Sequence, residues 1–292
     1  MSGERDTAQA EHAVPRPVRA GVSVVTVVRN GVATLERTIR SVLAQSHPDL
    51  EYVVVDGDSS DGTQELIRRY EGRLHWVSEP DQGLYDAMNK GLRLVADPER
   101  YVMFLNGDDV FAADDSLATL LAGSAGEDLL YGLLERHDEA LGYRDVVGGE
   151  LTRAGLRSGM IPHQTMLCRR RLFDVIGGFD LRYRIAADYD WLVRAFQRPE
   201  VTRRFVPIVV AVMARGGLSD RLYPRLLRER WTITRRCSSL PDVARYTAVV
   251  TLIEYPRYLA QRLLRRLGLL NWARDLRRPR RSSAAQLGAP PP

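Results

Sequence analysis

The sequence predicts an α/β protein with a Rossmann-like, mostly parallel central sheet flanked by helices. Between about residues 20 and 125, apolar runs of strand length alternate with segments of helical spacing. The first run, Val22 to Val28, is continuously apolar or β-branched, which is typical of a parallel strand buried on both faces. Acidic, glycine-punctuated motifs follow several runs, at the strand ends where such sheets bind ligands.

Each expected element in this region has its own signal. Arg29 to Gly31 form a turn, and residues 34–45 carry apolar side chains at helical spacing. Pro48 ends that connection. The other expected strands and helices, in chain order, are Glu51 to Val55, Thr63 to Tyr70, His75 to Ser78, Leu84 to Val95 and Tyr101 to Leu105.

After residue 129 the pattern changes to short strand-like pieces with glycine turns, up to residue 155. Further expected elements are helices at 169–176 and 187–197, a strand at 205–213, and basic amphipathic helices at 222–236 and 255–276. We therefore expect a disordered lead over 1–19, an α/β domain over 20–220, a basic helical extension over 221–281 and a disordered tail over 282–292.

Charge and cysteine usage limit the cellular setting. The net charge is +5, and nine arginines and one aspartate lie between Arg257 and Arg281. This stretch is either a site for an anionic phospholipid surface or a solvated helical face. Cys168 and Cys237 provide neither a disulfide framework nor metal-binding spacing, which favours a reducing compartment. Residues 1–19 lack the apolar region of a signal peptide, and no window reaches the roughly 18 apolar residues needed to cross a bilayer. The expected location is the cytoplasm or the inner face of the cell membrane.

Two acidic motifs predict chemistry. An Asp-rich pair after an apolar run, as in FLNGDD (104–109), can hold Mg²⁺ or Mn²⁺, and such a cation can hold a diphosphate. This motif points to a nucleotide-diphosphate substrate. A separate motif, AADYDW (186–191), provides a carboxylate that could act as a base.

Six segments together resemble the inverting family-2 glycosyltransferases of GT-A fold, especially bacterial enzymes of cell-envelope and glycolipid assembly. The resemblance covers residues 21–217. The segments, in order, are SVVTVVRN, TLERTIRSVLAQSHPDLEYVVVDGDSSDGT, DQGLYDAMNKG, FLNGDD, PHQTMLCRRRLFDVIGGFD and RIAADYDWLVR. It implies sugar transfer from a nucleotide-sugar donor to a hydroxyl of a glycan or glycolipid acceptor, with a divalent cation and without a nucleic-acid partner.

On the donor side, the resemblance implies that Asp56 contacts the nucleotide base and that Val28 and Asn30 line the same pocket. An alternative is that Asp56 only caps the following turn. Gly57 stands where the family often has a second Asp. The third helix adds donor-binding candidates at its amino end, where free N–H groups attract phosphate: Asp81, Gly83, Asp86, Asn89 and Lys90. Lys90, the only lysine of the chain, is either a diphosphate contact or an exposed side chain.

The resemblance also places the metal. Asn106 to Asp109 occupy the family's Asp-x-Asp position, with an amide as the first ligand. Asp108 is the expected metal ligand and Asp109 its neighbour, although a polar turn would look the same in isolation.

His163 and Asp188 are the remaining candidates. His163, in PHQ, is expected at the donor diphosphate, the metal or the acceptor, unless it is simply packed. Asp188 aligns with the family's general base, and Asp190 is the second choice, since residues two apart cannot share one helical face. Ala187 replaces a Glu that usually supports the acceptor side.

Two other functions fit parts of the sequence. A nucleotidyltransferase or other nucleotide-binding α/β enzyme would also use Asp108 and a metal, but VVTVVRNGVATLERT lacks a Gly- and Lys/Arg-rich phosphate loop. A non-catalytic membrane-bound scaffold would need no base, and the two aspartates of AADYDW weigh against it.

Overall fold

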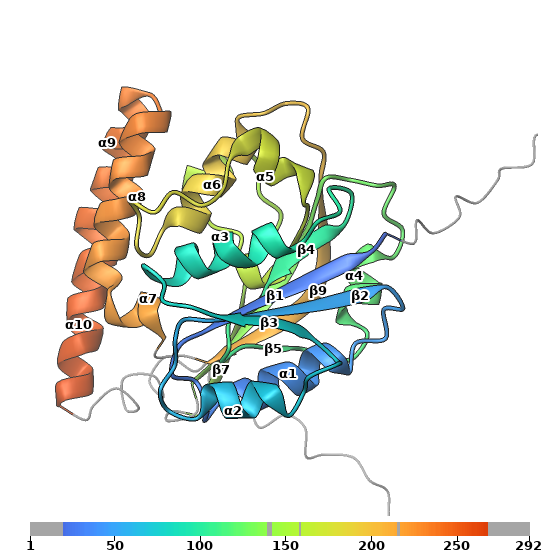
Figure 1. Ribbon diagram of the computed structural model, residues 1–292. Helices are drawn as coiled ribbons and strands as arrows, with labels where there is room; N and C mark the ends of the chain where they lie inside the picture. The colour runs from blue at the N-terminus through green and yellow to red at the C-terminus, as the bar shows by residue number, and fades with distance from the viewer. Residues whose placement is uncertain (1–19, 139–141, 158, 215–216, 268–292) are drawn as a thin grey trace, which may run out of the picture. The chain divides into compact units, whose positions relative to one another are not determined.

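The computed structural model describes residues 20–138, 142–157, 159–214 and 217–267. The predicted disordered segments at 1–19 and 282–292, and residues 268–281 of the predicted extension, lie outside this range. The chain divides into two compact units, which meet in sequence between Leu222 and Tyr223 (Figure 1).

The first half of the first unit alternates strands and helices as predicted. Its parallel strands lie in the order β3-β2-β1-β4. Val28 at the end of β1 pairs with Asp56 at the end of β2, so both carboxyl ends reach the same edge of the sheet. The elements are β1 (Val22–Val28), α1 (Leu35–Leu43), β2 (Leu50–Asp56), α2 (Thr63–Arg68), β3 (His75–Ser78), α3 (Leu84–Leu94) and β4 (Tyr101–Phe104).

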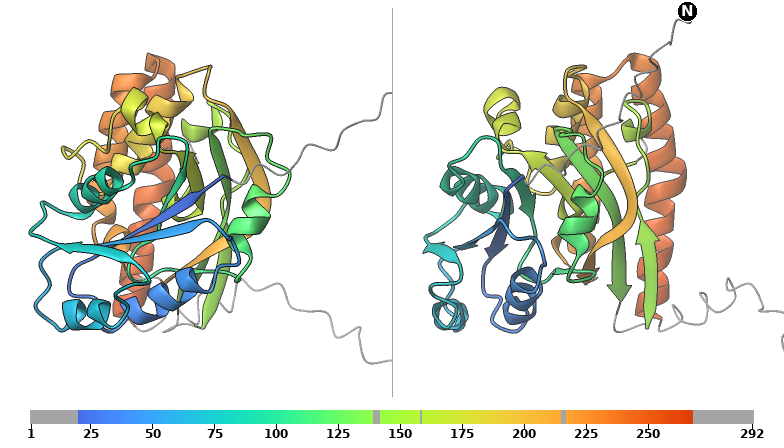
Figure 2. Two further views of the ribbon diagram at one scale, coloured as in Figure 1. Left: turned by 45° about the vertical axis from the view of Figure 1, so that its right-hand side comes forward. Right: turned by 90° about the vertical axis from the view of Figure 1, so that its right-hand side faces the viewer.

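The second half extends the sheet with mixed pairing. β8 joins β4 in antiparallel fashion, β6 pairs antiparallel with β8 and parallel with β9, and β7 and β5 complete the nine strands found within the described ranges. Register shifts near Leu133 interrupt the pairing of β6 with β9, as expected where a strand bends, and the sheet curls (Figure 2). The elements are β5 (Val110–Phe111), α4 (Ser116–Leu121), β6 (Leu129–Asp138), β7 (Tyr143–Val147), η2 (Gly155–Arg157), η3 (His163–Thr165), β8 (Met166–Arg169), α5 (Arg171–Ile176), α6 (Ala187–Phe196), β9 (Arg203–Ala214) and α7 (Leu218–Arg221).

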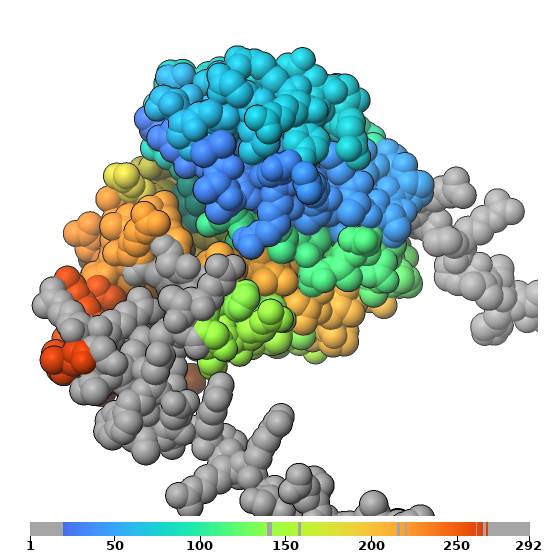
Figure 3. All heavy atoms as spheres, turned by 90° about the horizontal axis from the view of Figure 1, so that it is seen from below, coloured from blue at the N-terminus to red at the C-terminus, as the bar shows by residue number. Residues whose placement is uncertain are grey.

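The predicted fold class, an α/β sheet flanked by helices, is confirmed. All seven residues of β1 are buried, as its continuous apolar run predicts. Leu35, Ile39 and Val42 of α1 join the core on one face of the sheet. In Figure 3, which looks at the side that carries α1 and α2, the blue to cyan residues form an unbroken surface. On α3, Gly91 allows close approach to the sheet, since a Cβ there would lie 2.4 Å from a methyl of Val25.

The second unit consists of α8 (Tyr223–Cys237), α9 (Leu240–Val249), a π-helical turn η4 (Val250–Glu254) and α10 (Tyr255–Arg266). The indole N–H of Trp231 donates to the hydroxyl of Thr247 over 3.0 Å, and the hydroxyl of Tyr223 donates to Glu254 over 2.7 Å. The π-helical turn ends two residues before Pro256, whose ring cannot fit a regular helix interior. Across the described part of the chain, no helix combines the length and apolar character required to cross a membrane.

Candidate active site

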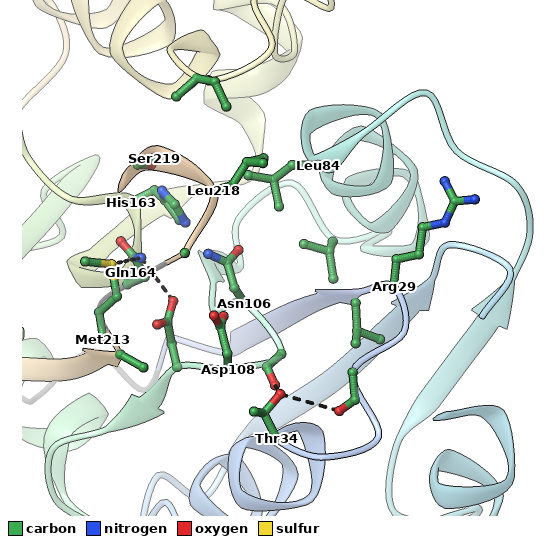
Figure 4. A pocket seen from close by; sticks show the side chains of 18 of the residues that line it. Arg29, Thr34, Leu84, Asn106, Asp108, His163, Gln164, Met213, Leu218 and Ser219 are labelled. Atoms are coloured by element: carbon green, nitrogen blue, oxygen red, sulfur yellow. Dashed lines mark hydrogen bonds between the residues drawn. The ribbon is translucent and has the colours of Figure 1, made fainter. Parts of the chain in front are cut away.

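A cavity of about 490 Å³ opens at the carboxyl ends of β1 and β4 (Figure 4). Its walls come from the ends of β1 and β9, the loop after β4, the first residues of α3, η3, the start of α6, and α7. This is the edge at which parallel α/β sheets bind ligands, because loops and helix ends converge there.

The loops after β1 and β2 are tied together by side chains. Asn30 adopts a left-handed backbone conformation with φ 52°. Its N–H donates to the hydroxyl of Ser59 (2.7 Å), and its side-chain oxygen accepts the N–H of Ser60 (3.0 Å). The N–H of Gly31 donates to the hydroxyl of Thr63 at 2.9 Å. Asn30 therefore lines the pocket while its amide oxygen holds the neighbouring loop.

Asp56 is buried at the last position of β2 and does not line the pocket. Its Oδ2 accepts the N–H of Ser59 (3.0 Å) and the hydroxyl of Ser78 (2.6 Å), which is the turn-capping geometry. Its Oδ1 has no partner among the residues that the structure describes. The carboxylate thus both fixes the turn and retains one free acceptor.

Asp81 lies against Gly57. Its Oδ1 accepts the N–H of Gly83 at 2.8 Å, and a Cβ at Gly57 would lie 2.1 Å from its Oδ2. The Asp81 carboxylate therefore fills the space that a side chain at position 57 would need. This is a physical reason for glycine at a position where the resembled family often has aspartate.

The other candidates of α3 serve as links between segments. The ammonium of Lys90 lies 3.0 Å from Glu79 and 3.5 Å from Asp86, and donates to the carbonyl of Pro80 at 2.6 Å. Asn89 exchanges two hydrogen bonds of 2.9 Å with the backbone of Phe179. None of the five candidates around the start of α3 (Asp81, Gly83, Asp86, Asn89 and Lys90) lines the pocket.

Helix α1 fixes the acidic loop after β4. The hydroxyl of Thr34 donates to the carbonyl of Gly107 (2.9 Å), and the hydroxyl of Thr38 donates to the carbonyl of Asp109 (2.7 Å). The guanidinium of Arg37 donates to the carbonyl of Asp108 at 3.2 Å. These bonds hold the backbone of the loop, and the Asp108 side chain faces the pocket (Figure 4).

The oxygen atoms of this loop have few donors. Asp109 is buried, and its Oδ2 accepts a hydrogen bond from the amide of Gln164 at 3.0 Å. Burial and then the adjacent Asp108 raise the pKa of Asp109 to about 7, and burial also raises the pKa of Asp108. Oδ1 of Asp109 and Oδ1 of Asn106 have no partner within the described ranges.

These oxygens suit a hard divalent cation, which prefers carboxylate and amide ligands. A cation would pair the buried oxygens and favour the ionised carboxylates. The described residues contain no cluster of three or more His, Cys, Asp or Glu side chains placed to hold a metal. This loop therefore offers a cation two carboxylates and one amide oxygen. A bound substrate would have to provide the remaining ligands.

The cavity has two acidic walls. The first is the loop after β4 with Asp108 and Asp109, and the second lies at the start of α6 with Asp188. Oδ2 of Asp188 lies 3.0 Å from Nδ1 of His163, and Oδ1 accepts both the hydroxyl of Tyr85 and the N–H of Tyr189 at 2.8 Å. Nε2 of His163 is buried without a partner among the described residues. Asp190 instead pairs with Arg194 at 2.9 Å and does not line the pocket.

The structure therefore gathers only part of the predicted set. The predicted residues that line the cavity are Val28, Asn30, Asn106, Asp108, His163 and Asp188, together with Asp109 beside the expected metal ligand. Other lining residues were not singled out from the sequence: Thr34, Tyr85, Gln164, Met213, Leu218 and Arg221. Gln164 adjoins His163 in the PHQ segment, and this adjacency was the one available signal.

Comparison with known proteins identifies the class. The model of glycosyl transferase family 2 matches residues 23–140. A "PGL/p-HBAD biosynthesis glycosyltransferase" of Mycobacterium tuberculosis is 30% identical over 261 residues, which cover 86% of this chain and 97% of the relative. The chain therefore belongs to glycosyl transferase family 2.

Solved structures show the same fold at low sequence identity. Staphylococcus aureus TarS 1–349 in complex with UDP-GlcNAc has a TM-score of 0.60 at 16% identity, covering 80% of this chain and 73% of that one. The mannosyltransferase PcManGT of Pyrobaculum calidifontis, in complex with GDP-Man and Mn²⁺, has a TM-score of 0.57 at 18% identity, covering 91% and 90%. The protein is thus a glycosyltransferase with a GT-A-like fold.

Proposed function

We propose that this glycosyltransferase moves a sugar from a nucleotide-diphosphate donor to an acceptor hydroxyl of a lipid-linked or envelope glycan, with inversion at the anomeric carbon. The observation that carries the proposal is one cavity with two different acidic walls, Asp108 with Asp109 and Asp188 with His163. The names of the similar proteins support the substrate class, since they include PGL/p-HBAD biosynthesis, UDP-GlcNAc and GDP-Man.

The donor occupies the side of the sheet edge formed by β1, β2 and β4 in this proposal. Val28 and Asn30 line its pocket, and the unpartnered Oδ1 of Asp56 accepts from the nucleotide base. The residues around the start of α3 shape the donor pocket indirectly, because they are paired within the protein. Asp81 accepts the N–H of Gly83, Asp86 accepts the N–H of Gln82, and Lys90 pairs with Glu79. Asn89 links α3 to the backbone of Phe179.

A divalent cation, Mg²⁺ or Mn²⁺, belongs beside Asp108, with Asn106 and Asp109 as neighbouring oxygen donors. When bound, such a cation stabilises the negative charge that develops on the departing diphosphate. Thr34 and Thr38 keep the loop rigid, so the oxygens need little reorganisation.

Asp188 takes the acceptor's proton as attack on the anomeric carbon begins, and His163 lies against its Oδ2. One in-line displacement then inverts the anomeric centre, so no enzyme nucleophile is required. Asp190 stays outside this step, because its carboxylate is paired with Arg194.

The test is donor turnover by the full-length protein. UDP-GlcNAc and GDP-mannose are offered with Mn²⁺, and release of nucleoside diphosphate is measured. We expect nucleoside diphosphate to be released with Mn²⁺ and its release to stop in excess EDTA. Full activity in EDTA contradicts the metal assignment, and failure to bind or cleave any nucleotide sugar contradicts the function. A nucleotidyltransferase would instead release pyrophosphate from a nucleoside triphosphate.

An anionic membrane surface is the proposed partner of the segment from η4 through α10 to Leu267. Leu252, Leu259, Leu263 and Leu267 are exposed by 74%, 47%, 57% and 59% and are spaced along one helical stripe. Arg257 and Arg262 are exposed on the same segment. An interfacial helix places such leucines among lipid chains and the arginines at headgroups, each contributing on the order of 1 kcal/mol near an anionic surface.

Sedimentation with liposomes tests this partner. The full-length protein should pellet with anionic liposomes at low salt, and Leu259→Ser with Leu263→Ser should not. Leu94→Ser, an exposed leucine of α3, is the matched control and should pellet like the wild type. Absence of the full-length protein from anionic pellets at low salt would end the membrane proposal.

A further inference from the structure

We propose that Tyr85 is a positioning residue for the proton transfer. Its hydroxyl holds the Asp188 carboxylate, and it stays hydrogen-bonded both before and after Asp188 takes the acceptor's proton. This inference rests on the proposed function, in which Asp188 is the base, and it adds a residue of α3 to that step. The contribution of Tyr85 comes from a hydrogen bond between residues 103 positions apart in the sequence.

The Tyr85 hydroxyl lies between two oxygen acceptors. It is 2.8 Å from Oδ1 of Asp188 and 2.9 Å from the carbonyl oxygen of Ile185. Tyr85 lines the cavity but is only 3% exposed, so its hydroxyl is largely removed from bulk water. A phenolic hydroxyl has one hydrogen to donate and can also accept. It can therefore redirect its hydrogen from one acceptor to the other without moving its oxygen.

The charge of Asp188 decides which acceptor receives that hydrogen. A hydrogen bond to an ionised carboxylate is about twice as strong as one to a neutral acceptor, so the hydroxyl first donates to Oδ1. Once Asp188 is protonated, the hydroxyl can donate to the carbonyl of Ile185, and its oxygen can accept from the carboxyl. Tyr85 thus keeps its hydrogen bonds on both sides of the reaction, and little reorganisation is needed when the proton arrives.

The ring of Tyr85 is fixed by aromatic packing and by α3. Its centroid lies 5.4 Å from that of Phe179, which also packs against Phe104 and Phe173. One turn further along α3, Asn89 exchanges two hydrogen bonds of 2.9 Å with the backbone of Phe179. These contacts tie α3 to the segment that leads into α6, so the hydroxyl reaches the carboxylate from a fixed direction.

Other groups hold the same carboxylate from different segments. The N–H of Tyr189 donates to Oδ1 at 2.8 Å, and Nδ1 of His163 lies 3.0 Å from Oδ2. A backbone N–H can donate but cannot accept, so it cannot take a hydrogen bond from a protonated carboxyl. The Tyr85 hydroxyl can serve both the ionised and the protonated form of Asp188.

The step with Tyr85 in place is balanced. The acceptor O–H bond breaks and its proton goes to the Asp188 carboxylate, while the acceptor oxygen forms the bond to the anomeric carbon. The bond from that carbon to the diphosphate oxygen breaks, and its electron pair leaves with the nucleoside diphosphate. The O–H bond of Tyr85 is kept throughout and turns from Oδ1 toward the carbonyl of Ile185.

Tyr85→Phe tests this role, because it removes the hydroxyl and keeps the ring. Turnover is measured as nucleoside diphosphate release from UDP-GlcNAc or GDP-mannose with Mn²⁺, with water as the acceptor. We expect kcat to fall about 10-fold, the loss that corresponds to one hydrogen bond to a charged group, and donor KM to stay within about twofold. A kcat within about twofold of the wild type overturns the proposal.

Tyr52→Phe is the matched control. Tyr52 is also 3% exposed and its hydroxyl donates to that of Thr26 at 3.1 Å, but it does not line the cavity. This variant should keep the wild-type kcat and pH profile of turnover. Tyr85→Phe should move the acid limb of that profile to higher pH, because the ionised carboxylate loses a donor. An acid limb at the wild-type pH would show that the hydroxyl does not act on the base.

A fluorinated ring covers the case in which Tyr85→Phe does not fold. Tyr85→fluorotyrosine keeps the hydroxyl and the ring contacts, and the fluorine makes the hydroxyl a stronger donor. The acid limb of the pH profile should therefore move to lower pH, opposite to the shift in Tyr85→Phe. An unmoved acid limb in this variant would contradict the proposal.

A double-mutant cycle in thermal unfolding needs no turnover and keeps the two proposals distinguishable. If the hydroxyl acts through the carboxylate, Tyr85→Phe should lower Tm less than half as much when Asp188→Ala is also present. Equal losses in both backgrounds would assign the hydroxyl to the carbonyl of Ile185 alone and overturn the inference. The expected coupling in a wild type that cleaves no nucleotide sugar would instead count against the proposed function.

Discussion

The two acidic walls of the cavity are satisfied in opposite ways. After β4, Asp109 and Asn106 each keep one buried oxygen without a partner in the described structure, and the pKa values of Asp108 and Asp109 are raised. At the start of α6, the Asp188 carboxylate accepts from Tyr85, Tyr189 and His163. The carboxylates of the first wall therefore need a positive ion from outside the chain. The Asp188 carboxylate of the second wall is already held by hydrogen bonds from neighbouring side chains and backbone.

This difference separates binding from proton transfer. A buried carboxylate without donors is costly to ionise, so it favours a cation. A carboxylate that accepts hydrogen bonds from its neighbours is held in one orientation and keeps a site for an incoming hydroxyl. Substitutions on the first wall should therefore affect metal and donor binding, while those on the second should affect turnover.

The largest effect is expected for Asp108→Asn. Loss of one charged ligand should abolish transfer and weaken Mn²⁺-dependent donor binding more than acceptor binding, because the cation joins protein and diphosphate. Isothermal titration with UDP-GlcNAc or GDP-mannose, with and without Mn²⁺, measures the effect. The thermal unfolding of the variant should resemble that of the wild type. Unchanged Mn²⁺-dependent donor binding would remove the distinction between the walls.

Asp188→Asn should lower kcat by about 10²-fold or more and leave donor affinity nearly unchanged. The amide keeps the size of the side chain but is far too weak a base to take the acceptor's proton. Steady-state kinetics at several donor concentrations separates kcat from KM. A loss confined to donor KM would place Asp188 on the binding wall.

A pH-dependent stability term is expected from Asp109. Its pKa rises from an ordinary value of 3.8 to about 7. Between these pH values the folded protein holds a proton that the unfolded chain releases, so the free energy of unfolding should fall as pH rises from about 4 to 7. Thermal unfolding in EDTA measures this slope.

Asp109→Asn is the matched variant for that slope. It cannot ionise, so the difference between the two proteins isolates Asp109 from the other carboxylates. Saturating Mn²⁺ should flatten the wild-type slope, since a cation favours the ionised form. Equal slopes for wild type and variant in EDTA would show that the wall after β4 does not hold a protonated carboxyl.

The sequence predicted the first half of the sheet well, because each strand there is a short apolar run followed by a helix of clear periodicity. It missed β8, because its four residues directly precede a helix. It also missed α9, which lies between the two basic amphipathic helices that were predicted. The mixed pairing of β6, β8 and β9 depends on contacts between distant segments. Local periodicity carries no information about such partners.

The site was partly predictable for a similar reason. Asp108 and Asp188 follow from motif order, whereas Thr38 acts through a bond to a backbone carbonyl 71 residues away. Lys90 was predicted as a diphosphate contact or an exposed side chain, and the structure pairs it with Asp86 and Glu79. Its spacing of four residues from Asp86 was a signal for that pairing.

The smallest effect is expected for Asp190→Asn, which tests whether the second wall consists of Asp188 alone. Oδ2 of Asp190 lies 2.9 Å from Nε of Arg194, and that guanidinium also donates to the carbonyls of Ile176 (2.5 Å) and Gly178 (2.8 Å).

Because Arg194 keeps both carbonyl contacts, Asp190→Asn should loosen this loop without dismantling it. A cost of about 1 kcal/mol, or about 2–4 °C in Tm, is expected for one weakened charged hydrogen bond in a domain of this size. Turnover should stay within about twofold of the wild type, because the carboxylate does not reach the cavity. An inactive Asp190→Asn beside an active Asp188→Asn would reverse the assignment. The acceptor's proton would then go to Asp190, the carboxylate that the structure pairs with Arg194.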